Sequence, residues 1–201
     1  ILNRGCANPV FDYIMPRITN LHKILWLSIP MLISMIYLLF RGKRQVQFWV
    51  LCAALSVSIS DPVTVRIAKK AFNRARPCKL VAGTSKYNYA DTRLVPGEEC
   101  PGSASFPSSH ASNTMALATV CWWFHRKERK IRTVEGAEKE PRFPKEYLWF
   151  LLPVVIGYTR IYLGYHYPSD VVGGWCFGAV IAVTLLLTLG RAAYRCKLET
   201  T

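Results

Sequence analysis

The sequence predicts an all-α protein: an integral membrane helical bundle of about five transmembrane helices, preceded by an N-terminal helix in the membrane interface. Apolar residues make up 51% of the 201 residues and gather in five long runs. A run of roughly 20 such residues matches the roughly 30 Å hydrocarbon core of a bilayer. The net charge of +14 comes from basic residues in blocks between these runs, a pattern typical of membrane proteins. A soluble protein this basic would indicate nucleic-acid binding, but this distribution does not, and we expect no nucleic-acid partner.

The length fits one membrane-embedded domain over residues 1–201. Residues 1–20 are too polar and too few to span a bilayer, so we predict a helix that lies in the interface. The spans are predicted at residues 21–40, 46–68, 107–124, 147–163 and 171–189. Pro30 predicts a kink in the first span. Three glycines in the last span permit the close approach of another helix: Gly173, Gly174 and Gly178.

The distribution of basic residues indicates the topology. The basic stretches 41–44, 125–145 and 191–201 follow the first, third and fifth spans, which predicts that they are cytoplasmic. The loop over residues 69–106 and the turn over residues 160–170 then lie on the extracytoplasmic face. The third span begins on that same face, so three polar groups far apart in the chain are expected to meet there.

One carboxylate, Asp61, lies within the second predicted span. An ionisable residue at membrane depth is a functional candidate by default. Asp61 could equally be a buried partner of Arg66 or a residue at a helix end, and the sequence leaves these alternatives open.

The first polar group contains Lys69, Arg76 and Pro77. The two cations are seven residues apart, about two helical turns, so on a helix both could contact one anion. The alternative is a basic anchor at the membrane interface.

The second polar group begins the third span. Ser105 can cap the helix that Pro107 begins, which leaves backbone N–H groups and the positive end of the helix dipole facing outward. Such a helix start binds phosphate, and the Ser108 and Ser109 hydroxyls would be additional donors. His110, in the first turn, could give a proton to a leaving oxygen, although a histidine here can also be structural.

The third polar group is a short stretch with Arg160, His166 and Asp170. An arginine can hold a phosphate, a histidine can act as base or nucleophile, and a carboxylate can orient that histidine. Pro168 ends any helix after His166, and Ser169 or Asp170 can cap the fifth span. The turn is expected to bring Asp170 to the Nδ1 proton of His166 and leave Nε2 free to attack.

In chain order the three groups spell Lys-x6-Arg-Pro, Pro-Ser-x-His and Arg-x5-His-x3-Asp. This ordered set resembles the type 2 phosphatidic acid phosphatase superfamily, which includes membrane lipid phosphatases and soluble vanadate haloperoxidases. The resemblance covers residues 53–189, and the predicted spans favour the membrane members. Two positions depart from the family pattern, since Ser109 stands where Gly is usual and Thr159 where Ser is usual. Ser109 keeps its backbone N–H and Thr159 keeps a hydroxyl, so we expect phosphate binding to survive both changes.

The resemblance implies a role for each motif residue. His166 would be the nucleophile that forms a phosphohistidine, Asp170 would orient it, and His110 would be the general acid. Five residues would bind the phosphate oxygens: Lys69, Arg76, Ser108, Ser109 and Arg160. The implied reaction needs no metal ion and no cofactor, because the cations neutralise the oxygens around phosphorus. The sequence shows no cluster with metal-ligand spacing.

The implied function is hydrolysis of a phosphate monoester or diphosphate on a membrane lipid that enters from the bilayer. The short five-span form and the Pro-Ser-x-His-Ala motif resemble bacterial members that act on undecaprenyl diphosphate, lipid A 1-phosphate or phosphatidylglycerol phosphate. We therefore expect a bacterial inner-membrane protein with an extracytoplasmic site. The alternatives are a lipid-to-lipid phosphotransferase with the same site and, in a different class, a membrane transporter with a polar outer-facing site. The sequence does not indicate an oligomeric state.

The predicted extracytoplasmic loop is basic and carries tyrosines, which suits a headgroup with more than one phosphate or a sugar. The residues concerned are Lys79, Lys86, Tyr87, Tyr89 and Arg93.

Two cysteines, Cys78 and Cys100, flank this loop on the oxidising side of the membrane. We predict that they form a disulfide, with Cys6 as a competing partner. Cys52, Cys121 and Cys176 lie within predicted spans and are expected to be packing residues.

Overall fold

The computed structural model describes residues 3–21, 24–79, 92–136, 141 and 143–199, with only the backbone of 191–199. Every regular element in these ranges is helical, which confirms the predicted all-α class. In chain order the elements are α1 (Pro9–Thr19), α2 (Leu25–Arg41), α3 (Arg44–Pro62), the π-helical turn η2 (Val63–Ala68), α4 (Lys69–Phe72), the 3₁₀ turn η3 (Pro77–Lys79), α5 (Ser109–Val134), the 3₁₀ helix η5 (Lys145–Phe150), α6 (Leu151–Tyr162) and α7 (Pro168–Glu199).

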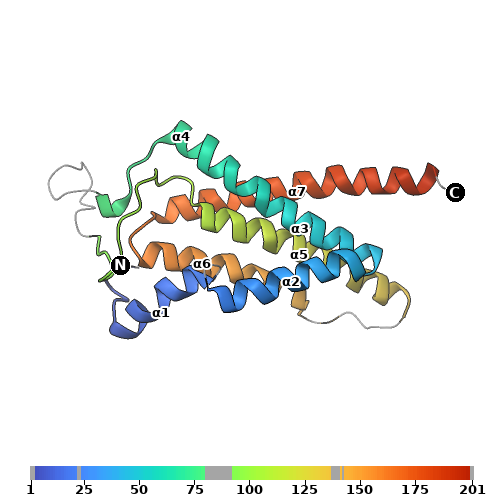
Figure 1. The fold of residues 1–201 in the computed structure, drawn as a ribbon, viewed down its shortest axis with the longest axis horizontal. Coiled ribbons are helices and arrows are strands. Elements are labelled where there is room, and N and C mark those ends of the chain that lie inside the picture. The colour runs from blue at the N-terminus through green and yellow to red at the C-terminus, as the bar shows by residue number, and fades with distance from the viewer. Residues whose placement is uncertain (1–2, 22–23, 80–91, 137–140, 142, 200–201) are drawn as a thin grey trace.

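Helix α5 forms the centre of the bundle and packs against α3, α6 and α7 (Figure 1). Helix α2 packs on α3 at the periphery, and α1 packs against α6. The start of α5, the end of α6, the start of α7 and α4 lie at one end of the bundle, which we call the site end. The connection between α2 and α3 and the last turns of α5 lie at the opposite end.

Glycine allows α7 to approach α5 closely. A Cβ atom added at Gly178 would lie 2.1 Å from the carbonyl oxygen of Ser112, and one at Gly174 would lie 2.5 Å from that of Ser108. Neither distance is possible for a real Cβ, so the two helices pack backbone to backbone as predicted. This contact fixes the first turn of α5 relative to the first turns of α7.

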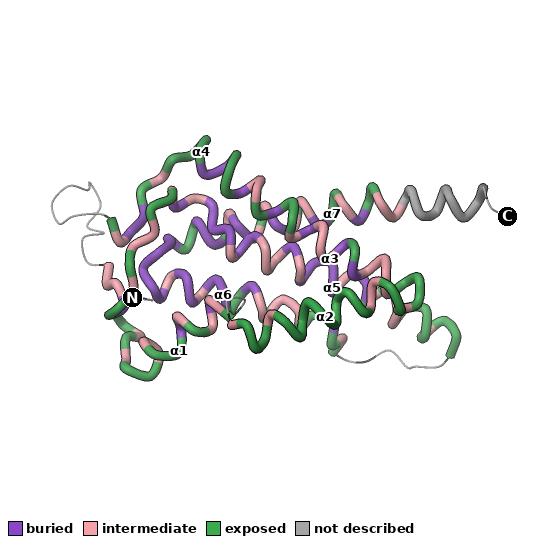
Figure 2. The backbone as a smooth tube through the Cα atoms, viewed as in Figure 1, coloured by how far each residue is buried: buried purple, intermediate pink, exposed green. Residues whose placement is uncertain are grey.

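Much of the outer surface is apolar. Helix α2 has no buried residue and exposes large side chains along its whole length, including Trp26 at 90% exposure (Figure 2). An apolar surface of this extent fits a hydrocarbon environment. Within the described ranges, two helical segments are long and apolar enough to cross a membrane, Arg44–Phe72 and Pro168–Gly190, while α2 is shorter. The count of five spans therefore stays a prediction.

Two helices extend beyond the predicted spans. Helix α5 continues through ten residues of the stretch predicted as a connecting loop and ends at Val134. Helix α7 continues to Glu199 through most of the predicted basic tail. Lys, Arg and Glu are good helix formers, so the change from apolar to charged sequence marks a change of environment and not a helix end.

The N-terminal helix is present, as predicted. Asn8 caps α1, since its side-chain oxygen accepts a hydrogen bond from Phe11 N–H at 2.9 Å, and Pro9 occupies the first helical position. Its location in the membrane interface stays a prediction.

The predicted disulfide between Cys78 and Cys100 is present, with Cα atoms 5.9 Å apart, while Cys6 is a free thiol. Cys52 and Cys121 are buried as expected. The expectation of packing is wrong for Cys176, which is exposed because it lies on the outward side of α7.

Candidate active site

The first cation of the site stands at the end of a long helical rod. Helix α3 passes through the π-helical turn η2 into α4, where Lys69 is only 8% exposed. The rod ends at Asn73, whose left-handed backbone (φ 39°) caps α4. Arg76 therefore lies on an irregular segment, and the expectation that both cations share one helix is wrong.

Ser103, from the segment before α5, joins these two cations. The guanidinium of Arg76 donates from Nε to Ser103 O at 2.8 Å and from Nη2 to Ser103 Oγ at 2.9 Å. Lys69 Nζ lies 3.5 Å from the same hydroxyl. Sequence reasoning missed Ser103, since a lone serine in a loop carries no pattern.

His166 lies against Arg76 on one side and Asp170 on the other. Arg76 Nη1 is 3.0 Å from His166 Nε2 and also donates to Tyr165 O at 2.9 Å. A guanidinium can only donate, so Nε2 must be the nitrogen with the lone pair and Nδ1 must carry the proton. Nδ1 lies 3.5 Å from Asp170 Oδ2, longer than an ordinary hydrogen bond. The geometry therefore gives the tautomer required for attack through Nε2.

His166 is also held neutral. Burial lowers the pKa of its imidazole to about 4, and the positive charges of Arg76 and Arg160 add to this effect, although the Asp170 carboxylate opposes it. The side chain is 3% exposed. A neutral imidazole with a lone pair on Nε2 is the nucleophilic form.

The Asp170 carboxylate is fully buried and has several donors. Arg74 Nη1 donates to Oδ1 at 2.8 Å, while Ser105 Oγ at 2.5 Å and Tyr167 N–H at 2.9 Å donate to Oδ2. Helix α7 begins at Pro168, so Asp170 lies inside its first turn and not before it as predicted, and its carboxylate caps the helix by accepting from Tyr167 N–H. The other two partners were missed, although Arg74 stands inside the first motif and could have been recognised there as a third cation.

Arg74 is held at two further points. Its Nη1 also donates to Ser169 Oγ at 2.8 Å, and its guanidinium lies over the Tyr167 ring, 4.0 Å from the centroid. The side chain is 38% exposed, so this ion pair is at the edge of the site.

The start of α5 differs in detail from the prediction. The helix begins at Ser109 with Ser108 as its N-cap, and no side chain caps it. The predicted cap, Ser105, lies four residues before the helix begins, and its hydroxyl donates to Asp170 instead. Within the described residues, the Ser108 and Ser109 hydroxyls are buried and have no hydrogen-bond partner. These hydroxyls and the N–H groups of the first turn, which contains His110, are neutral donors of the kind that suits an anion.

Arg160 comes from the last turn of α6 and is 6% exposed. Its Nη1 donates to Thr19 Oγ1 at 3.1 Å, and its guanidinium lies over the Tyr165 ring, 4.7 Å from the centroid. The neighbouring Thr159 donates its hydroxyl to Ile156 O within α6, so that proton is not available to a phosphate. Thr19 was missed because it lies in a helix 141 residues away in sequence.

Other candidate residues do not join this group. Asp61 is exposed and accepts from Asn113 Nδ2 at 3.0 Å. In the proposed headgroup cluster, Arg93 pairs with Asp12 and Lys79 donates to Gly102 O at 2.9 Å. The other members, Lys86, Tyr87 and Tyr89, lie outside the described residues.

Taken together, Lys69, Arg76 and Arg160 are buried cations whose contacts in the described chain are hydroxyls, carbonyls, an imidazole and a ring. None of them forms an ion pair there. Buried unpaired cations are unfavourable unless an anion completes the site, and their arrangement beside a neutral imidazole suits a phosphate group. In the same ranges, no group of three or more His, Cys, Asp or Glu residues is placed to hold a metal ion.

The comparisons with known proteins agree with this chemistry. Residues 45–194 match the family model of the PAP2 superfamily. A lipid A 4'-phosphatase of Bacteroides thetaiotaomicron is 27% identical over 188 residues, which cover 86% of this chain and 71% of that protein.

Two solved structures have a similar fold. One is the PAP2-type phosphatidylglycerolphosphate phosphatase from Bacillus subtilis, with a TM-score of 0.58 and 17% identity over 93% of this chain and 80% of that one. The other is Aquifex aeolicus LpxE, with a TM-score of 0.55 and 24% identity over 92% of this chain and 90% of that one. At these identities the likeness shows the fold alone.

Proposed function

Because the chain belongs to the PAP2 superfamily, we propose that it hydrolyses a phosphate monoester or diphosphate on a membrane lipid, through a phosphohistidine at His166 and without a metal ion. The family and the enzyme class, a lipid phosphatase, are as the motifs predicted. The observation that carries the proposed mechanism is the contact between Arg76 Nη1 and His166 Nε2. Because a guanidinium only donates, this contact requires that Nε2 carries the lone pair.

In the first step, Nε2 of His166 attacks the phosphorus of the lipid phosphate. A nitrogen–phosphorus bond forms, and the bond from phosphorus to the leaving oxygen breaks. His110 gives its proton to that leaving oxygen. Lys69, Arg76 and Arg160 neutralise the oxygens of the pentavalent phosphorus, and the hydroxyls of Ser108 and Ser109 with the Ser109 N–H donate to them.

Asp170 supports this step. The imidazole becomes positively charged as the nitrogen–phosphorus bond forms, and the carboxylate beside Nδ1 stabilises that charge. In the second step, His110 takes a proton from a water molecule whose oxygen attacks phosphorus. The nitrogen–phosphorus bond breaks, inorganic phosphate leaves, and His166 returns to its neutral form.

We propose a phosphorylated bacterial envelope lipid as the substrate. A lipid A phosphate is the first candidate, because the relative from Bacteroides is named for that reaction. Undecaprenyl diphosphate and phosphatidylglycerol phosphate are the next candidates, the latter supported by the similar fold of the Bacillus enzyme. The same site could transfer the phosphoryl group to a second lipid in place of water.

We also propose that the site faces the extracytoplasmic side of the inner membrane. The Cys78–Cys100 disulfide at the site end suits an oxidising compartment. The last turns of α5, at the opposite end, are strongly basic, which suits the cytoplasmic side. A transporter would be expected to hold its ionisable residues near mid-membrane, whereas the buried cations here gather at one end.

The test is a phosphate-release assay on the purified protein in detergent with lipid A 1-phosphate, lipid A 4'-phosphate, undecaprenyl diphosphate, phosphatidylglycerol phosphate and phosphatidic acid. We expect release from at least one lipid to persist in EDTA. A phosphoenzyme that is labile in acid and stable in base should be trapped with the wild type and be absent from His166→Ala. Loss of activity in EDTA with rescue by magnesium would contradict the mechanism, and transport without phosphate release would support the other class.

A further inference from the structure

Helix α1 lies outside the stretch that matches the family model, yet it contacts the site. We infer that α1 completes the phosphate site, with Thr19 as a positioning residue that fixes the guanidinium of Arg160. This inference rests on the proposed function, since it gives Arg160 its role in binding phosphate oxygens.

The contact itself is buried and specific. Thr19 is 2% exposed, and its hydroxyl oxygen accepts from Arg160 Nη1 at 3.1 Å. The Tyr165 ring lies against the face of the guanidinium, 4.7 Å from the centroid. In the described part of the chain, Arg160 Nε is buried without a hydrogen-bond partner. One donor and one face of the guanidinium are thus held by protein, while the Nε edge keeps a donor for phosphate oxygens.

A neutral acceptor is the useful partner here. A carboxylate at this position would bind Arg160 more strongly, but it would also neutralise the charge and compete with the phosphate. A threonine hydroxyl orients the guanidinium and leaves its charge in place. Helix α1 uses a carboxylate only away from the site: Asp12, near its start, pairs with Arg93, while Thr19, at its end, contacts Arg160.

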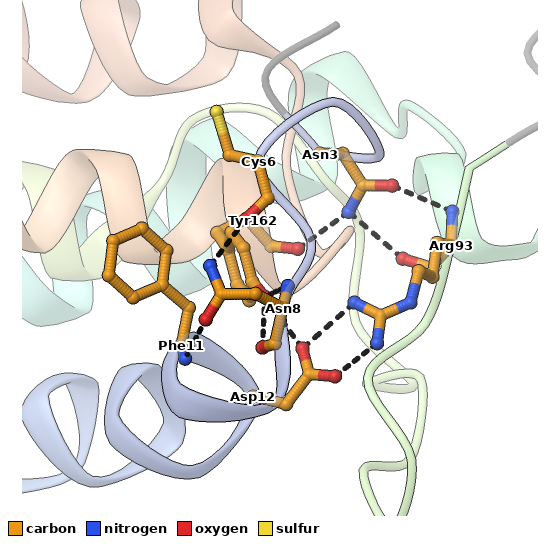
Figure 3. Close-up of polar contacts among 7 residues, drawn as sticks. All are labelled: Asn3, Cys6, Asn8, Phe11, Asp12, Arg93 and Tyr162. Atoms are coloured by element: carbon orange, nitrogen blue, oxygen red, sulfur yellow. Dashed lines mark hydrogen bonds and ion pairs between the residues drawn. The ribbon is translucent and has the colours of Figure 1, made fainter.

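Helix α1 is fastened firmly enough to act as a support. Asp12, Met15 and Thr19 have the i, i+3, i+7 spacing of one helix face, and that face packs on α6. Asp12 accepts from both terminal nitrogens of Arg93 and from the Tyr162 hydroxyl at 2.6 Å (Figure 3). Met15 joins the apolar cluster that contains Tyr162 and Tyr165.

The segment before α1 adds a second fastening. Asn3 Nδ2 donates to Arg93 O at 2.9 Å and to Tyr162 O at 2.5 Å, and Asn3 Oδ1 accepts from Arg93 N–H at 2.7 Å (Figure 3). Arg160 is two residues before Tyr162 on α6, so the fastened residue and the positioned residue lie in the same helical turn. Asn3 and Asp12 therefore hold α1 in place, while Thr19, of these three residues, carries the hydrogen bond to Arg160.

The experiment compares Thr19→Val, which keeps the shape and removes the hydroxyl, with Thr19→Ser, which keeps the hydroxyl. Thr119→Val is the matched control, because Thr119 is a buried helical threonine whose hydroxyl bonds to its own helix at Met115 O. We expect Thr19→Val to lower kcat/KM for the lipid phosphate by roughly 10- to 100-fold, as a misplaced positioning group does. Most of the loss should be in kcat, since a positioned guanidinium fits the equatorial oxygens of the five-coordinate phosphorus better than those of the bound substrate.

Thr19→Ser should recover most of the activity, and Thr119→Val should resemble the wild type. In an Arg160→Gln background, Thr19→Val should have no further effect, because the group it positions is gone. Equal kcat/KM in wild type and Thr19→Val, or additive losses in the double variant, would overturn the inference.

Orthovanadate, which adopts the five-coordinate geometry of the transition state, separates this inference from the proposed function. Its stabilisation of the protein against heat should be weaker in Thr19→Val than in wild type, and equal stabilisation would overturn the role of Thr19. A wild-type protein that binds orthovanadate but hydrolyses no lipid phosphate would contradict the proposed function and leave the vanadate comparison as the test of Thr19.

Discussion

The two ends of the bundle differ in the partners that they give to arginine. At the opposite end, Arg129 contacts Glu146, with Nη2 and Nε both 2.9 Å from Oε1. Glu146 is 4% exposed; burial alone would raise the pKa of its carboxyl, but hydrogen bonds from its own backbone and from Arg129 lower it below its ordinary value. At the site end, Arg76 and Arg160 have only neutral partners among the residues described above.

Under the proposed mechanism, arginine serves structure at one end of the bundle and chemistry at the other. An arginine with a carboxylate partner is neutralised and fastens two elements, here α5 and η5. A buried arginine held by hydroxyls and carbonyls keeps its charge for a ligand, and the folded protein is less stable for it. Arg74 and Arg93 follow the first pattern, since each pairs with an aspartate at the edge of the site end.

The largest expected effect is at His166, at the site end, and His125 at the opposite end serves as its control. His166→Ala removes the proposed nucleophile and should lower kcat by about 10⁴-fold or more. His125, which accepts from Trp149 Nε1 at 2.9 Å at the opposite end, is the control. His125→Ala should keep activity within about twofold, since exposed residues away from the site have small effects. Phosphate release by His166→Ala at near-normal rates would remove the basis for the proposed mechanism.

The next prediction compares Arg76 at the site end with Arg129 at the opposite end, in both activity and stability. Arg76→Gln should lower kcat/KM by about 10²- to 10³-fold, because the proposed mechanism assigns Arg76 to stabilising the transition state. Its melting temperature in detergent should stay the same or rise, since an unpaired buried charge is removed. Arg129→Gln should do the reverse, with normal turnover and a loss of about 3 kcal/mol in stability, because Glu146 is left buried and unpaired. Similar profiles for the two variants would show that the ends do not differ in this way.

The parts of the site that could be predicted from the sequence are those whose residues lie close together along the chain. His166 and Asp170 are four residues apart, and Pro168 between them dictates the turn, so their meeting follows from local sequence. Ser108, Ser109 and His110 occupy a helix start that Pro107 and the following apolar run announce. These residues needed no tertiary information.

The contacts that could not be predicted join distant parts of the chain. Arg74 meets Asp170 across 96 residues and Arg160 meets Thr19 across 141 residues, and no spacing rule covers either pair. The helical arrangement expected for Lys69 and Arg76 failed because Asn73 adopts a left-handed conformation, which asparagine tolerates but does not require. In the fold, the prediction ended the helices α5 and α7 where their sequences become charged. This was wrong because hydropathy indicates the environment of a helix and not its length.

The Cys78–Cys100 disulfide allows the rigidity of the site end to be changed without changing its charge. Cys100 is three residues before Ser103, which accepts two hydrogen bonds from Arg76. Replacing both Cys78 and Cys100 by Ser should lower stability by about 3 kcal/mol, and KM should rise because the support of Arg76 becomes looser. Cys176→Ser, at an exposed position on α7, should change neither quantity. An unchanged KM in the double variant would mean that the helices alone hold Arg76 in place.

A further expected effect is on the titration of His166, whose pKa is lowered to about 4 by burial and by the charges of Arg76 and Arg160. As pH falls below the ordinary value of about 6.5, the unfolded chain takes up a proton that the folded chain refuses. The free energy of unfolding should therefore fall by up to about 1.4 kcal/mol per pH unit between 6.5 and 4, and this contribution should be constant above 6.5.

Arg76→Gln should raise the pKa of His166, because one of the two nearby positive charges is lost. The pH range over which the free energy of unfolding changes should then become narrower. Arg129→Gln, at the opposite end, should leave the pKa of His166 unchanged. Carbon-13 NMR of labelled histidine, compared with His166→Asn to assign the signal, measures the pKa directly in all of these proteins. A value near 6.5 in the wild type would mean that the site end is solvated and that its cations are not held apart from water. A shift in Arg129→Gln as large as that in Arg76→Gln would show that charge at the two ends is not independent.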